Sequence, residues 1–191
     1  MLTMNNKHKR DGIVALNMPP EETCSNKCKY CYVNKWYRYP SVRPALRRNF
    51  EASKTPHFVE QIQSELRPKH RYVRIHSSGD FYRADRSESI AYLQKWISLA
   101  ERNPDRVFYA YTKEIDLFEG PTRAVDELPP NFRIIYSLGG KHGHLIDVKR
   151  HLHARIFKSL AEMKKAGYVD CSVSDLVAAT TKSLKIGLIL H

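Results

Sequence analysis

The feature that most constrains this chain is a regular alternation of short apolar runs with amphipathic segments. Six apolar runs, bounded by glycine, proline or small polar residues, indicate strands. Because they alternate with helical segments, they favour an α/β fold with parallel strands, either a curled open barrel or a doubly wound sheet. The predicted strands are 13–18, 72–77, 107–111, 132–137, 168–173 and 185–190.

The segments between the predicted strands carry the signals of helices. Thr55-Pro56 is a pair typical of a helix start, and apolar residues recur after it at every fourth position. The clearest helix is expected over 85–103, where Asp85 and Glu88 resemble a capping box. Further helical segments are predicted at 114–128 and 148–166.

Length and composition predict one soluble domain. A chain of 191 residues with 42% hydrophobic and 27% charged residues is long enough for a single core, and we expect one domain over 1–191 with a short basic N-terminal extension over 1–11. No apolar run approaches the ~20 residues of a membrane span, and no signal-peptide core is evident. Together with clustered cysteines, this predicts a cytoplasmic protein without a membrane partner.

Three of the four cysteines lie in one loop that directly follows the first predicted strand. Cys24, Cys28 and Cys31 are spaced C-x3-C-x2-C, and thiolates so close together can hold one inorganic centre. Three ligands are one short of a closed site, so the loop predicts either an iron–sulfur cluster with an open position or a zinc site completed by Cys171 or a histidine. Zinc sites usually use two separated pairs of ligands, and the sequence has no second pair, which favours the cluster.

Small and polar residues follow several later strands. The carboxyl ends of parallel strands meet at one edge of a sheet, where sites are usually found. Asp80 and Lys113 fall at such ends, and each also has an ordinary interpretation, as a turn residue and as a solvated side chain. The candidate catalytic residues are Lys113, His142 and Cys171, although a lone cysteine such as Cys171 is more often a small buried residue.

The aromatic residue before the third cysteine adds a resemblance. Cys24-x3-Cys28-Lys29-Tyr30-Cys31 resembles the cluster motif of radical S-adenosylmethionine (SAM) enzymes. The resemblance implies a partial (β/α)6 barrel of parallel strands and a [4Fe–4S] cluster on the three cysteines, with SAM on the open iron. It further implies that an external electron donor supplies the electron that cleaves SAM reductively, giving a 5′-deoxyadenosyl radical that abstracts hydrogen from a substrate.

The resemblance also implies roles for five other residues. Tyr30 is expected near the adenine of SAM, and Ser137 near its ribose. Ser78, Gly79 and Asp80 stand where the family typically carries a Gly-Gly-Glu-like turn for the SAM amino group, so these three depart from the pattern. More narrowly, the cysteine loop and the stretch from His76 to Phe81 look like small phage and mobile-element proteins of the gene product 88 type.

The formal charge of +12 suggests an anionic partner such as nucleic acid. The segment 32–50 interleaves aromatic and basic residues. Such residues can stack on bases, but the pattern favours the alternative that they cover the cysteine loop and pack against the domain. The competing function is therefore a non-catalytic, metal-dependent nucleic-acid-binding protein, with zinc or an iron–sulfur cluster. The sequence leaves the substrate of a radical SAM enzyme unknown, with nucleic acid, peptide and small molecule all open.

Overall fold

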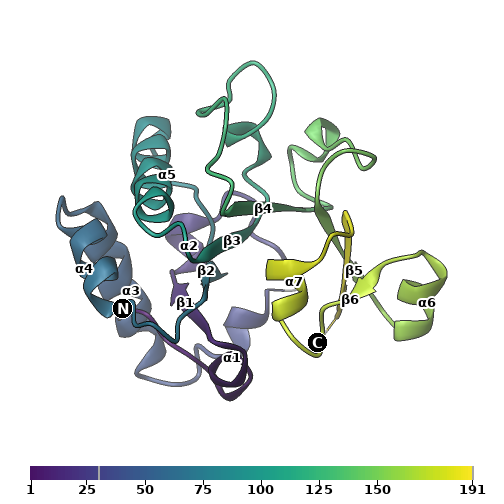
Figure 1. The fold of residues 1–191 in the computed structure, drawn as a ribbon, viewed down its shortest axis with the longest axis horizontal. Helices are drawn as coiled ribbons and strands as arrows, with labels where there is room; N and C mark the ends of the chain where they lie inside the picture. The colour runs from purple at the N-terminus through teal and green to yellow at the C-terminus, as the bar shows by residue number, and fades with distance from the viewer. Residues whose placement is uncertain (30, 191) are drawn as a thin grey trace.

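A computed structural model describes residues 1–29 and 31–190 of the chain. Within these residues a seven-stranded sheet runs in the order β1-β2-β3-β4-β5-β7-β6, and neighbouring strands are parallel. The sheet curls into half of a barrel (Figure 1), which confirms the predicted α/β fold with a partial parallel barrel. The strands are β1 (Ile13–Asn17), β2 (Tyr72–Ser78), β3 (Val107–Thr112), β4 (Phe132–Ser137), β5 (His153–Phe157), β6 (Val169–Asp170) and β7 (Lys185–Ile189).

Helices lie on both faces of this sheet, with the longer ones on the convex face (Figure 1). The α-helices are α1 (Asn6–Asp11), α2 (Pro20–Thr23), α3 (Val42–Lys54), α4 (Phe58–Glu65), α5 (Arg86–Glu101), α6 (Leu160–Lys165) and α7 (Leu176–Thr180). Three short 3-10 turns are η1 (Tyr32–Lys35), η2 (Ile115–Leu117) and η3 (Gly143–Leu145). In this described part of the chain, none of the helices combines the length and the apolar character needed to cross a bilayer.

Because successive side chains of a strand point to opposite faces, the strands contribute to two cores. In β1, Val14 belongs to the larger core and Ile13 to the smaller one. The larger core lies between β1–β3 and the helices α4 and α5, and it includes the fully buried Trp96. The smaller core lies inside the curl, where α7 packs its alanines against the strands. This leaves the carboxyl ends of the strands as the open end of the half-barrel.

The N-terminal residues pack onto the fold. Thr3 forms a β-bridge with Ala15 of β1, and the amino group of Met1 lies 2.7 Å from a carboxylate oxygen of Glu65. Asn5 then caps α1, because its side chain accepts the His8 N–H at 2.8 Å. The segment expected as an extension therefore holds α1 against the concave side of the sheet.

The predicted helix over 148–166 is wrong. This segment contains strand β5 and, after it, the shorter helix α6. The apolar residues Leu152, Ile156 and Leu160 have the four-residue spacing of a helix face, which explains the prediction. The strand forms instead because β5 pairs with β4 on one edge and with β7 on the other. Tertiary pairing here overrides a local pattern.

Three smaller differences concern the bounds of elements. The strand expected over 168–173 is limited to β6, and the helix expected over 114–128 is limited to the turn η2. The helix α4 begins at Phe58, and Thr55 instead ends α3, where its N–H donates to the Ala52 carbonyl at 3.1 Å. Helix α5 agrees with its prediction, and Asp85 caps it by accepting the Ser87 N–H.

Candidate functional site

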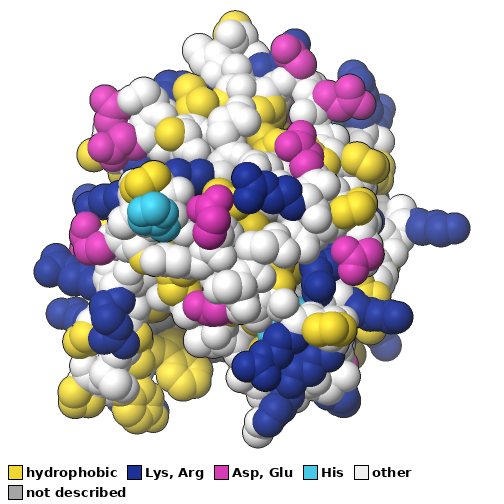
Figure 2. Space-filling view, turned by 60° about the vertical axis from the view of Figure 1, so that its left-hand side comes forward, with side chains coloured by type: hydrophobic (Ala, Val, Ile, Leu, Met, Phe, Trp, Pro, Cys, Tyr) yellow, Lys and Arg dark blue, Asp and Glu magenta, His cyan; other side chains and the backbone are white. Residues whose placement is uncertain are grey.

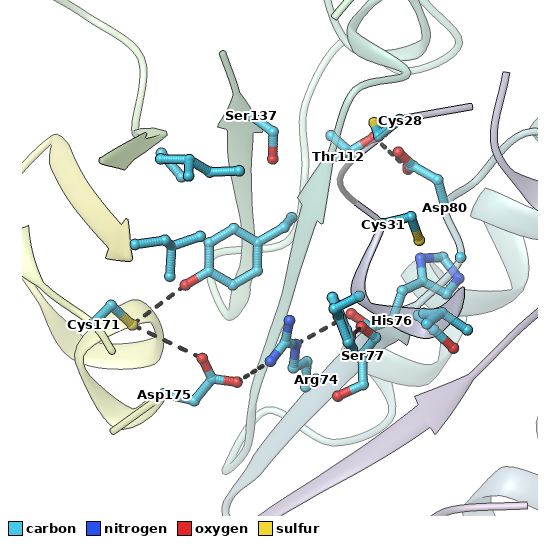
Figure 3. A pocket seen from close by; sticks show the side chains of 18 of the residues that line it. Cys28, Cys31, Arg74, His76, Ser77, Asp80, Thr112, Ser137, Cys171 and Asp175 are labelled. Carbon is cyan, nitrogen blue, oxygen red and sulfur yellow. Dashed lines mark hydrogen bonds and ion pairs between the residues drawn. The ribbon is translucent and has the colours of Figure 1, made fainter. Parts of the chain in front are cut away.

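A cavity of about 490 Å³ opens at the carboxyl ends of the strands, a volume within the usual range for small-molecule sites. All three cysteines of the C-x3-C-x2-C loop, which follows β1, line this cavity. Figure 3 shows Cys28 and Cys31 on one side of this cavity and Cys171 on the other. The structure therefore brings the cysteine loop to the edge of the sheet where a site was expected.

The cysteine loop is held by residues from two other strand ends. The buried carboxylate of Glu114, just after β3, accepts hydrogen bonds from the Ser25 N–H at 3.1 Å and the Ser25 hydroxyl at 2.7 Å. The side-chain oxygen of Asn26 accepts the Lys141 N–H at 2.8 Å, beyond β4. These bonds fix the residues between Cys24 and Cys28 relative to the sheet.

The turn after β2 lies directly against the start of this loop. Gly79 has a φ of +89°, and a side chain there would lie 2.5 Å from the Cβ of Met18 and 2.6 Å from the hydroxyl of Thr23. Only glycine accommodates both the left-handed backbone and this close approach. Ser78, beside it, donates its hydroxyl to the Met18 carbonyl at 2.9 Å. Ser78 and Gly79 therefore join β2 to the chain that leads into the cysteine loop.

Asp80 is a buried carboxylate that organises the next strand end. One oxygen accepts the Thr112 hydroxyl at 2.6 Å and the Phe81 N–H at 2.8 Å, and the other accepts the Lys113 N–H at 2.8 Å. Burial, with the nearby charge of Glu114, raises the pKa of Asp80 in spite of these hydrogen bonds. A carboxylate offers about four acceptor sites, so these three hydrogen bonds leave one of them unused.

Two groups near the cysteines can interact with a bound group. The Lys113 ammonium lies 3.3 Å from the Cys28 sulfur, so it places a positive charge beside the cysteine loop. His76 lines the cavity and is buried; its Nε2 lies 2.9 Å from the Tyr92 hydroxyl, while its Nδ1 has no hydrogen-bond partner among the described residues. Burial also raises the pKa of the Cys24 thiol, which therefore needs a cation to be a thiolate.

The donors suit a cluster with three protein ligands. Three thiols that line one cavity supply the soft ligands that such a centre needs, and the adjacent ammonium supplies a compensating charge. The unpartnered Nδ1 of His76 is a further polar group without a protein partner among the described residues. Among residues 1–29 and 31–190, no group of three or more His, Cys, Asp or Glu side chains is arranged to hold a metal ion. The fit therefore rests on the chemistry of the donors and on their shared cavity.

The opposite end of the cavity contains a buried ion pair. Arg74 of β2 pairs with Asp175, the residue before α7 (Figure 3). The same Asp175 oxygen lies 3.3 Å from the Tyr109 hydroxyl and 3.4 Å from His8 Nε2. Burial alone would raise the pKa of Asp175, but the charge of Arg74 and the hydrogen bond from His8 hold it at about 2. The carboxylate is therefore ionised at neutral pH.

Cys171 belongs to this end of the cavity. Its sulfur lies 3.3 Å from the Tyr111 hydroxyl and 3.9 Å from the second oxygen of Asp175. Burial raises the pKa of the Cys171 thiol, so it is protonated near neutral pH. Cys171 thus lies across the cavity from Cys28 and Cys31 rather than beside them (Figure 3).

The other predicted residues fall in different places. Ser137 lines the same cavity at the end of β4. His142 lies in a smaller pocket on the far side of the cysteine loop, where its Nε2 is 3.6 Å from an Asp116 carboxylate oxygen, so the structure does not bring it to the cysteines. Tyr30 lies outside the described residues.

Sequence reasoning missed Arg74, Asp175 and Glu114. Arg74 lies within the alternating pattern of a predicted strand, and its partner Asp175 is 101 positions away in the sequence. Glu114 is 89 positions from Ser25, and the sequence pattern predicts only the start of a helical segment there. A charged residue inside a predicted strand was the one available signal, because a buried charge requires a partner.

The family follows from a comparison of the whole chain. Residues 1–188 match the family model described as Gene product 88, and the chain belongs to that family. This confirms the narrower of the two resemblances seen in the sequence. No curated protein and no solved structure matches the chain.

Proposed function

We propose that this protein is a radical SAM enzyme with one [4Fe–4S] cluster, held by Cys24, Cys28 and Cys31. The observation that carries the proposal is the position of these three thiols: one loop after the first strand of a parallel half-barrel, on the wall of a cavity at the strand ends. When bound, the cluster and SAM supply a 5′-deoxyadenosyl radical that removes a hydrogen atom from a substrate.

The chain's own residues have distinct parts in this proposal. Glu114 and Asn26 hold the cysteine loop at the cavity, and the Lys113 ammonium places a positive charge 3.3 Å from the Cys28 sulfur. Asp80 has one acceptor site left for the ammonium of the methionine part of SAM, and Ser137 offers a hydroxyl at the end of β4 for its ribose. This chain has Ser78-Gly79-Asp80 where radical SAM enzymes typically carry a Gly-Gly-Glu-like turn, so Asp80 is the acidic residue of the turn.

Anaerobic reconstitution with iron and sulfide tests the first half of the proposal. We expect about four irons and four sulfides per chain, a brown protein and an electron paramagnetic resonance signal on reduction. The Cys31→Ala variant should lose this cluster, whereas Cys171→Ala is the matched control and should keep it. A colourless protein, or a Cys31→Ala variant that still holds about four irons, would overturn the proposal.

The second half is tested by cleavage of SAM. With dithionite as reductant, the loaded protein should form 5′-deoxyadenosine and methionine, measured by chromatography. A loaded cluster without cleavage would contradict the enzymatic part alone. Zinc on purification, with no affinity for SAM, would instead favour the competing function of a non-catalytic, metal-dependent nucleic-acid-binding protein.

A further inference from the structure

The segment that follows the cysteine loop exposes aromatic rings among arginines and lysines. Trp36 is 53% exposed and Tyr39 is 44% exposed, and their ring centroids lie 6.1 Å apart. Large aromatic side chains are normally buried when packing alone decides their position. Trp36 and Tyr39 are therefore only partly covered by the domain, and about half of each side chain faces solvent. We call this the aromatic–basic surface; it consists of Lys35, Trp36, Arg38, Tyr39, Arg43 and Arg47.

Every charged side chain in the segment that carries the aromatic–basic surface is positive. From residue 24 to residue 50 the sequence has seven lysines and arginines and no aspartate or glutamate. The basic residues of the aromatic–basic surface are all exposed. Arg38 lies 5.0 Å from the centre of the Tyr39 ring, and Arg43 lies 4.4 Å from the centre of the Tyr37 ring. The arginines therefore add planar cationic groups beside the exposed rings.

The concentration of basic residues in the aromatic–basic surface is informative because basic residues elsewhere are interspersed with acidic ones. Figure 2 shows Lys and Arg side chains around one face of the molecule, with acidic side chains between them. The net charge of +12 by itself thus indicates no particular surface. Acidic neighbours of the aromatic–basic surface are few: Glu22 pairs with Arg47 at 3.4 Å, and Glu21 accepts the Tyr37 hydroxyl.

Tyr32 connects this surface to the cavity. It begins η1, the turn that leads to Trp36, and it is 43% exposed while also lining the cavity. Its hydroxyl donates to the Ser77 carbonyl at the end of β2. A chain bound across Trp36 and Tyr39 would therefore reach the wall formed by the cysteine loop.

We propose that the aromatic–basic surface binds single-stranded nucleic acid and brings one nucleotide to the cavity as the substrate. Exposed rings stack on unpaired bases, and the arginines and lysines contact the phosphates. An acidic peptide would use the charges but not the flat aromatic faces. A duplex hides its bases and would leave Trp36 and Tyr39 without a stacking partner. The substrate role rests on the proposed radical SAM function, whereas the binding role does not.

The test is fluorescence anisotropy of the full chain with labelled oligonucleotides. The probes are a 20-nucleotide oligothymidylate, a 20-nucleotide oligouridylate and a duplex of the same length, the first two separating DNA from RNA. We expect one or both single strands to bind more tightly than the duplex. The double variant Trp36→Ala/Tyr39→Ala should weaken single-strand binding roughly tenfold or more, with Leu160→Ala, an exposed apolar residue on α6, as control.

Charge variants provide an independent readout. Loss of Arg38 or Arg43 should weaken binding and reduce the slope of log affinity against log salt by about 0.7. The control is Arg102→Ala, at an exposed arginine directly after α5, which should leave both quantities unchanged. The proposal is overturned by absent binding, by equal affinity for the duplex, or by aromatic variants that bind like the parent protein.

The two proposals fail in different ways. The aromatic–basic surface is separate from the cysteines, so Trp36→Ala/Tyr39→Ala should still load about four irons. Cys31→Ala should still bind the oligonucleotides. A protein that binds the oligonucleotides but holds no cluster would overturn the proposed enzymatic function and support the nucleic-acid-binding surface. A protein that holds a cluster but does not bind the oligonucleotides would overturn the binding surface and leave the enzymatic function standing.

Discussion

At one end of the cavity, Arg74 and Asp175 form an ion pair whose carboxylate also faces His8 and Tyr109. At the other end, three thiols lie on a loop that is held by a hydrogen bond from Ser25 to Glu114, just after β3. The first end pairs its charges within the protein, whereas the second presents thiols to the cavity. We infer from this comparison that the first end stabilises the half-barrel, whereas the second end binds the cluster under the proposed function.

The largest effect expected from this comparison is on Asp175→Ala. The substitution leaves Arg74 largely buried without its counterion, which typically costs about 3–5 kcal/mol of the free energy of unfolding. Urea denaturation measures this cost. The control is Glu51→Ala, which removes an exposed pair with Lys54 and should change stability by less than about 0.5 kcal/mol. Similar small effects for both variants would break the comparison.

The second prediction concerns acid. The pKa of Asp175 is about 2 in the folded protein, below its usual 3.8. A depressed pKa stabilises the folded state above the usual pKa, and this contribution is lost as the pH falls from about 4 to about 2. We expect the parent protein to lose about 2 kcal/mol more than Asp175→Asn over this interval. Urea midpoints measured at pH 4, 3 and 2 follow the loss. The same decrease in stability for both proteins over these pH values would contradict the prediction.

The third prediction concerns the anchor of the cysteine loop. Glu114→Ala removes the acceptor of two Ser25 hydrogen bonds and should lower the free energy of unfolding by about 1–2 kcal/mol. Because the bonds hold the residues between Cys24 and Cys28, the variant should also retain less iron after reconstitution. Iron analysis of desalted protein measures this loss. Glu60→Ala, at an exposed site on α4, is the control and should retain iron like the parent.

The smallest effect on stability is expected for Cys31→Ala. Its side chain is half-buried, and the change should cost less than about 1 kcal/mol while it abolishes iron binding. The same denaturation and iron assays check both expectations. A Cys31→Ala protein that unfolds as easily as Asp175→Ala would show that the thiol end also supports the fold, and the contrast between the two ends would disappear.

The strand ends were predictable because parallel strands have a common edge. Asp80 and Ser137 were placed at the carboxyl ends of strands by pattern alone, and both line the cavity. The site residue Glu114 was not predictable, because its partner Ser25 is distant in the sequence and no local pattern joins them. The strand β5 was missed for a related reason, since its two neighbours in the sheet are β4 and β7.

The sequence by itself determined the parallel α/β layout and the position of the three cysteines after the first strand, since hydrophobic period and cysteine spacing are local properties. The tertiary structure decided what faces those cysteines. It placed Cys171 across the cavity with Tyr111, and it left Trp36 and Tyr39 exposed on the segment that follows the cysteine loop. These outcomes depend on which distant segments meet when the sheet curls, and burial and charge pairing are fixed only by those contacts.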